Sequence, residues 1–194
     1  FPTVAIVNYP CTMAVNNLLN LESVSKSFDI RALLDGVSLG VNAGDRIGVV
    51  GRNGGGKSTL IKVMAGIETP DSGRVSKAGS INIGLLGQSD ETDENSLVRD
   101  VVLGDLAMHE WAGNSKVREV LTGLFGGFSE ELLDRKISYL SGGERRRVNL
   151  AKLLIADLDL VLLDEPTNHL DVEGVFWLAQ YLKRNTKLAV VVIT

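Results

Sequence analysis

Residues 51–59 have the residue types and spacing of a loop that binds phosphate. They read GRNGGGKST and match the pattern G-x-x-x-x-G-K-[ST]. Glycines let successive backbone N–H groups approach phosphate oxygens, and a following helix presents the positive end of its dipole to the same anion. Lys57 is placed to reach the β- and γ-phosphates, and the Ser58 hydroxyl is placed to bind Mg²⁺. A strand expected before the loop and a helix expected after it disfavour a chance match in a glycine-rich turn.

The contacts expected from this loop come from both its backbone and its side chains. The residues predicted to bind the nucleotide are Gly51, Asn53, Gly54, Gly56, Lys57, Ser58 and Thr59.

A second constellation is a pair of carboxylates at the end of an apolar run. Residues 160–163 read LVLL, and Asp164 and Glu165 follow directly. Ligands of open α/β sheets bind at the carboxyl ends of the strands. There, Asp164 would hold Mg²⁺ through its waters and Glu165 would polarise an attacking water. The alternative is a buried strand that simply ends in a polar turn.

A third constellation is the segment LSGGE at residues 140–144. Ser141 and Glu144 have the spacing of a capping box, which predicts that a helix begins here. A glycine-rich helix start is also an anion site, so Gly142 and Gly143 are candidates for binding a phosphate. The two interpretations are compatible.

Strand and helix patterns alternate along the chain, and they must position these groups. Helices are predicted at residues 57–65, 96–103, 114–124, 129–136, 141–156 and 172–182. Strands are predicted at residues 18–24, 32–41, 46–50, 74–75, 80–86, 160–163 and 188–193. This order predicts an α/β fold with a parallel sheet, an N-terminal antiparallel β patch and an inserted helical lobe at about residues 90–150.

Composition excludes several classes of protein. The 194 residues carry a formal net charge of −4, which gives no general bias toward nucleic acid or membranes. Cys11 is the one cysteine, so no internal disulfide can form, which fits a cytoplasmic location. No apolar run approaches the ~20 residues that span a bilayer. Residues 1–12 show no pattern, and Met13 is the expected natural start. Residues 1–16 are predicted to be a disordered or non-native leader, and residues 17–194 the domain.

Taken together, the three constellations resemble the ATP-binding-cassette (ABC) ATPases over about residues 17–194. Residues 51–59 resemble the Walker A loop, 140–144 the signature and 160–165 the Walker B strand. The resemblance implies a P-loop NTPase core that binds ATP and Mg²⁺. It also implies that Phe28 stacks on adenine and that Gln88, in the Q-loop, senses Mg²⁺ and the attacking water. The alternatives are a core phenylalanine and a solvent-exposed glutamine.

One stretch narrows the resemblance to a subfamily. Residues 164–171, DEPTNHLD, resemble the Walker B and D-loop segments of the ABC-F proteins, as does SGGERRRVN at residues 141–149. ABC-F proteins carry two cassettes in one polypeptide and no transmembrane domain, and many act on ribosomes or confer antibiotic resistance. For residues 145–147, RRR, we expect a solvated basic helix face rather than contacts to RNA.

The resemblance also implies a mechanism and partners. Two cassettes stack head to tail, so Ser141, Gly142 and Gly143 would donate to the γ-phosphate bound by the opposite cassette. The expected reaction is hydrolysis of ATP to ADP and phosphate. The expected partners are a second cassette and the ribosome or its RNA. Two alternatives are the ATP-binding subunit of a membrane transporter, whose partner is a permease, and a nucleotide-gated module with little turnover. The family's switch histidine is expected beyond Thr194, so the chain is expected to be a fragment with little activity alone.

Overall fold

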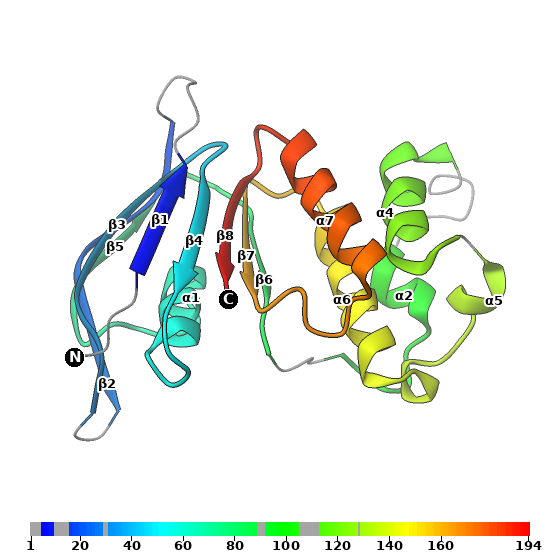
Figure 1. The fold of residues 1–194 in the computed structure, drawn as a ribbon, viewed down its shortest axis with the longest axis horizontal. Coiled ribbons are helices and arrows are strands. Elements are labelled where there is room, and N and C mark those ends of the chain that lie inside the picture. Colours follow the sequence, from blue (N-terminus) through cyan, green and yellow to red (C-terminus); the bar gives the residue numbers. More distant parts are fainter. Residues whose placement is uncertain (1–4, 10–15, 29–30, 89–91, 105–112, 128) are drawn as a thin grey trace. The chain divides into compact units, whose positions relative to one another are not determined.

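The computed structural model describes residues 5–9, 16–28, 31–88, 92–104, 113–127 and 129–194. These residues form two compact units (Figure 1). The first comprises Phe1–Gly87, Leu158–Glu165 and Asn185–Thr194, and the second comprises Gln88–Asp157 and Pro166–Arg184. Each unit is described by itself below.

The first unit is built on a five-stranded sheet with the order β1-β4-β8-β7-β6. Its strands are β1 (Ala5–Tyr9), β4 (Arg46–Val50), β6 (Ile83–Leu86), β7 (Leu160–Asp164) and β8 (Ala189–Ile193). β4, β8, β7 and β6 pair in parallel, and β1 pairs antiparallel with β4 at one edge. β7 lies between two other strands and every one of its residues is buried, which suits its almost entirely apolar sequence.

A second, antiparallel sheet of three strands belongs to the same unit. It contains β3 (Arg31–Asn42), β2 (Asn17–Phe28) and β5 (Ser72–Lys77) in that order. Helix α1 (Lys57–Ala65) contacts β7, β6 and β3. Its buried face joins apolar residues of both sheets in one core. The predicted α/β class, parallel sheet and N-terminal antiparallel patch are thereby confirmed.

The second unit is helical. It contains α2 (Val98–Leu103), α4 (Ser115–Phe125), α5 (Glu130–Leu133), the short 3₁₀ helix Ile137–Tyr139, α6 (Gly142–Ile155) and α7 (Val172–Arg184). The predicted helical lobe is present, and it extends past residue 150 because α7 packs with the other helices of this unit. No helix of the described ranges is long and apolar enough to cross a membrane.

Two features differ from the sequence-based expectations. Residues 5–9 lie in the segment predicted to be a leader, yet they form β1, and Ile6 packs against the core. In the helix predicted at residues 172–182, helical spacing places Val172 and Phe176 on one apolar face, yet in α7 they are 80% and 65% exposed. Leu178 and Tyr181 are buried instead.

Aromatic contacts explain the orientation of α7. Trp177 stacks on Tyr181 with 5.1 Å between ring centroids. The Tyr181 hydroxyl donates to the Leu154 carbonyl of α6 at 3.1 Å. A Cβ atom at Gly123 of α4 would lie 1.9 Å from the Trp177 ring, so this glycine gives the indole its space. These aromatic contacts fix which face of α7 turns inward, and helical spacing alone could not distinguish the two faces.

Candidate nucleotide-binding site

The backbone of residues 51–56 requires glycine at specific positions. Gly54 and Gly56 have φ values of 73° and 87°, in the left-handed region that favours glycine. A Cβ atom at Gly56 would lie 2.3 Å from the Leu33 carbonyl oxygen, and one at Gly55 would lie 2.8 Å from that of Arg52. The loop therefore turns tightly between β4 and α1, and a side chain at Gly55 or Gly56 would meet the backbone.

The start of α1 is free of side-chain caps. Gly56 is its N-cap residue, no side chain caps it, and its first turn carries no acidic residue. The first-turn N–H groups of a helix have no partner within the helix, and they carry the positive end of its dipole. This helix start has the properties of an anion site.

Lys57 adds a positive charge within the same loop. The side chain is buried, at 6% exposure, and its Nζ donates to the Gly51 carbonyl at 2.6 Å. A buried ammonium is costly without partners. Its hydrogen bond to the loop's own backbone holds it beside the amides that an anion would approach.

The two carboxylates follow from the end of β7. Asp164 is 2% exposed and pairs in register with Ile193 of β8. The Glu165 N–H donates to the Ile193 carbonyl at 3.1 Å, and Glu165 has a φ of 48°. A non-glycine residue in the left-handed region is strained, and such strain clusters at functional sites.

The donors for a magnesium ion fit the chemistry of that ion. Ser58 supplies a hydroxyl from α1 and Asp164 a carboxylate from β7, and these two elements pack against each other. Mg²⁺ takes oxygen ligands and keeps several waters, so a site with few protein oxygens suits it.

Phe28 ends β2 with 49% of its surface exposed. The alternative of a core phenylalanine is therefore wrong, while stacking on adenine stays a prediction. Lys26 places its Nζ 5.6 Å from the ring centroid and pairs with Asp71 at 2.9 Å. The hydrogen bonds from Lys26 and from the Ser27 N–H lower the pKa of Asp71. Residues 26 and 28 share one face of a strand, so their spacing could have indicated this contact.

The predicted capping box at the start of α6 is present. The Glu144 N–H donates to Ser141 Oγ at 3.3 Å, and the Ser141 N–H donates to Glu144 Oε2 at 2.8 Å. The Ser141 hydroxyl also donates to that oxygen at 2.8 Å, and Arg135 pairs with Glu144 at 3.1 Å. The hydrogen bonds from Ser141, with a smaller contribution from Arg135, lower the pKa of Glu144.

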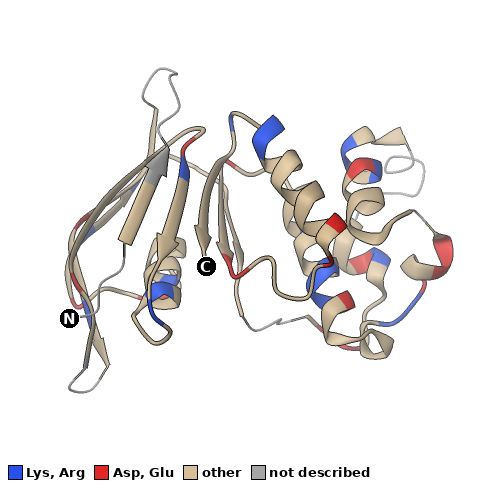
Figure 2. Cartoon of the chain, in the orientation of Figure 1, with Lys and Arg blue, Asp and Glu red and all other residues tan. Residues whose placement is uncertain are grey.

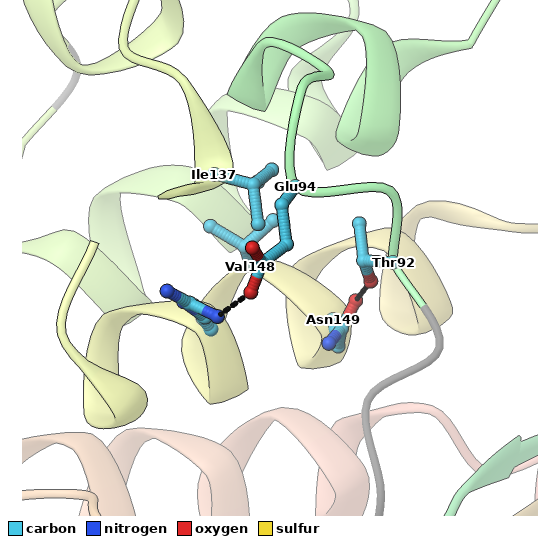
Figure 3. A pocket seen from close by; sticks show the side chains of 6 residues that line it. Thr92, Glu94, Ile137, Val148 and Asn149 are labelled. Atoms are coloured by element: carbon cyan, nitrogen blue, oxygen red, sulfur yellow. Dashed lines mark hydrogen bonds and ion pairs between the residues drawn. The ribbon is translucent and has the colours of Figure 1, made fainter. Parts of the chain in front are cut away.

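Gln88 lies two residues after β6, in the second unit, and is exposed. The second unit also contains a cavity of about 50 Å³. It is lined by Thr92, Glu94, Ile137, Arg145, Val148 and Asn149 (Figure 3). The Thr92 hydroxyl donates to Asn149 Oδ1 at 2.8 Å, and Arg145 pairs with Glu94 at 2.9 Å. A cavity of this size holds a water, not a nucleotide.

The three consecutive arginines of α6 are buried or form ion pairs with other residues of the chain. Arg146 is 6% exposed, which contradicts the expected solvated face for that residue. Arg145 pairs with Glu94, and Arg147 pairs with Asp171 at 3.0 Å. These partners could not be predicted from local patterns, because 51 and 24 residues separate the members of the two pairs.

The structure thus groups the predicted site residues by unit. The loop at residues 51–59, Phe28, Asp164 and Glu165 belong to the first unit. Gln88 and Ser141–Gly143 belong to the second unit, and their contacts to a nucleotide remain predictions.

Comparison with known proteins agrees with this geometry. The family model described as ABC transporter matches residues 34–168, more than half of the chain. The chain belongs to this family, whose cassettes are ATPases.

Individual relatives give the subfamily. The "energy-dependent translational throttle protein EttA" of Mycobacterium tuberculosis is 35% identical over 85% of this chain and 36% of its own length. The "probable ATP-binding protein YheS" of Escherichia coli K12 is 35% identical over 79% of this chain and 28% of its own. Within the family, the chain is most like the ABC-F proteins. It spans about a third of the length of these curated relatives.

A solved structure shows the same fold. It is the crystal structure of the archaeal ribosome recycling factor aABCE1 in complex with the ribosomal stalk protein aP1. The match covers 95% of this chain and 35% of the matched chain. The TM-score is 0.77 and the identity 27%. The predicted P-loop NTPase core is thereby confirmed.

Proposed function

We propose that the chain binds MgATP on residues 51–59 and contributes to its hydrolysis. The observation that carries this proposal is the start of α1, where an uncapped helix terminus, positive-φ glycines and the buried Lys57 lie together. Backbone amides and an ammonium suit a triphosphate, because they supply fixed donors without a negative charge. Membership of the ABC family supports ATP as the nucleotide.

Each residue has a role that its chemistry permits. The amides of residues 54–58 and Lys57 hold the phosphates, Phe28 stacks on the adenine, and Glu165 orients and deprotonates the attacking water. Ser58 and Asp164, with Gln88 as a further predicted ligand, would hold Mg²⁺, which would neutralise charge on the phosphate oxygens. Catalysis would then consist mainly of positioning and charge stabilisation. Ser141, Gly142 and Gly143 serve the nucleotide of a second cassette.

Lys57→Ala tests the binding site. We expect it to weaken MgATP binding in calorimetry by at least about tenfold, since hydrogen bonds to charged groups contribute ~1.5–3 kcal/mol. Lys62→Ala is the matched control, because Lys62 is an exposed lysine of the same helix. Equal affinity of the Lys57 variant and the unaltered protein would refute the site.

Glu165→Gln tests the role of the water-activating carboxylate. The amide keeps the size of the side chain but cannot take a proton. In the full-length protein we expect MgATP binding to persist while steady-state phosphate release falls by about 10²-fold or more, the range of general-base catalysis. Normal turnover would remove Glu165 from this role. Glu173→Gln, at an exposed position of α7, serves as the control.

The wider role we propose is that of an ABC-F-like protein that acts on ribosomes in the cytoplasm. The printed names of EttA and of the ribosome recycling factor support it. The family description keeps the transporter subunit as the second candidate. Sedimentation of the full-length protein with ribosomes in the presence of ATP would support the first role. Co-purification of a membrane permease would support the second and overturn the first.

A further inference from the structure

Two segments distant in the sequence meet within the second unit. Arg147 of α6 pairs with Asp171, directly before α7, at 3.0 Å. One helical turn earlier, a Cβ atom at Gly143 would lie 3.5 Å from the Cβ of His169. Residues 143 and 147 share one face of α6 because they are four apart. The signature helix therefore contacts the segment at residues 167–171 at two points.

Both members of the ion pair are held by a second contact. Asp171 Oδ1 accepts from the Gly174 N–H at 2.8 Å, while its Oδ2 pairs with Arg147. Arg147 also donates to the Leu124 carbonyl of α4 at 3.4 Å. His169 has a φ of 70°, so the chain between β7 and α7 holds a left-handed turn beside Gly143. Arg147 consequently joins α4, α6 and the start of α7.

A neighbouring ion pair shows what is particular to Arg147. Arg184 of α7 pairs with Glu119 of α4 at 2.7 Å, but their side chains are 60% and 42% exposed. The side chain of Arg147 is 26% exposed, and that of its partner Asp171 is 54% exposed, so the two pairs differ in the arginine. Exposed pairs contribute little to a fold, whereas a partly buried guanidinium with two acceptors has a fixed geometry. Figure 2 shows acidic and basic residues interspersed along these helices.

We propose that Arg147 is a positioning residue for ATP hydrolysis, acting through Asp171. It fixes residues 167–171 to α6, so that this segment and the Ser141–Gly143 amides take up their positions as one piece. Because it acts on a segment that binds the second cassette's nucleotide in the proposed function, the inference rests on that function. Arg147 does not touch the reacting atoms in this scheme.

The experiment compares Arg147→Gln, Asp171→Asn, their combination and Arg184→Gln in the full-length protein. Asparagine keeps an oxygen for the Gly174 N–H and removes only the charge that faces Arg147. We expect each single variant to lower kcat about fivefold with KM unchanged within about twofold. The double variant should fall no further, because both changes break one interaction. Arg184→Gln should leave kcat unchanged.

Hydrogen exchange supplies a readout that does not require turnover. Arg147→Gln and Asp171→Asn should speed amide exchange both at residues 140–149 and at residues 167–175, and Arg184→Gln should do so in neither segment. Unchanged exchange, additive losses of kcat, or an equal loss in Arg184→Gln would overturn the positioning role. If the unaltered protein does not hydrolyse ATP but the two segments still respond together, the proposed function fails while the structural coupling stands.

Discussion

Two helices of this chain begin at glycine-rich segments, and they begin differently. α1 starts after Gly56, and this residue has a left-handed backbone conformation and no side-chain cap. α6 starts after Ser141, whose hydroxyl and backbone exchange hydrogen bonds with Glu144. The first helix start leaves its amides for an external anion, and the second satisfies part of its own need.

The two helix starts would therefore use a bound anion differently. At α1, a phosphate would supply the acceptors that no side chain provides, and Lys57 would exchange the Gly51 carbonyl for that phosphate. At α6, the Ser141 hydroxyl already donates to a carboxylate at 2.8 Å, so it must leave Glu144 before it can donate to a phosphate. The α6 start therefore has a cap of its own, and its Ser141 hydroxyl would donate to an anion only in competition with Glu144.

The largest expected effect is that of an alanine at the start of α1, compared with an alanine at the start of α6. Gly56→Ala places a Cβ 2.3 Å from a backbone oxygen at a φ of 87°, so the loop must shift. We expect a loss of ~3 kcal/mol or more in unfolding free energy, together with loss of MgATP binding. Gly143→Ala meets His169 only at an ordinary 3.5 Å and should leave stability within ~1 kcal/mol.

Urea unfolding and calorimetry of the two alanine variants check this contrast. A Gly56→Ala protein as stable as the unaltered one would show that α1 does not begin in the described conformation.

A trade between stability and activity is expected at Glu165. Glu165→Gly should relieve the strain of its φ of 48° and raise the unfolding free energy by up to ~1 kcal/mol. The same change removes the proposed base and should abolish turnover. Thermal unfolding and phosphate-release assays of one preparation measure both effects. Lower stability than in Glu165→Gln would contradict the strain.

Removal of the Ser141 cap is expected to destabilise α6 without affecting the start of α1. Ser141→Ala deletes the oxygen that accepts from the Glu144 N–H, and it should cost ~1 kcal/mol of unfolding free energy. MgATP affinity of residues 51–59 should not change, because the two helices start independently. Chemical denaturation with a parallel titration tests this independence, and Ser115→Ala within α4 is the control.

The smallest effect is a dependence on pH. The pKa of Glu144 is lowered in the folded protein below its ordinary value of 4.5. Its contribution to stability is therefore present in full above that value, and it declines as the pH falls through the lower folded pKa. Unfolding free energies measured between pH 7 and about pH 3 should decline less for Glu144→Gln. Parallel curves for both proteins would show that the capping box does not depend on this charge.

The sequence predicted the features that local chemistry determines. The loop at residues 51–59, the strand that ends at Asp164 and the capping box at Ser141 each follow from neighbouring residues. Features that depend on distant residues were missed. The inward face of α7 depends on Gly123 and Tyr181 rather than on helical spacing. Strand β1 was missed because it is short and exists by pairing with β4.

A structure of the full-length protein with Mg²⁺ and a non-hydrolysable ATP analogue would show whether residues 51–59 bind the triphosphate. We expect phosphate oxygens about 3 Å from the amides of residues 54–58, at hydrogen-bonding distance. We also expect Lys57 Nζ to leave the Gly51 carbonyl for a phosphate. A nucleotide bound elsewhere, with Lys57 still bonded to Gly51, would rule out residues 51–59 as the phosphate-binding loop.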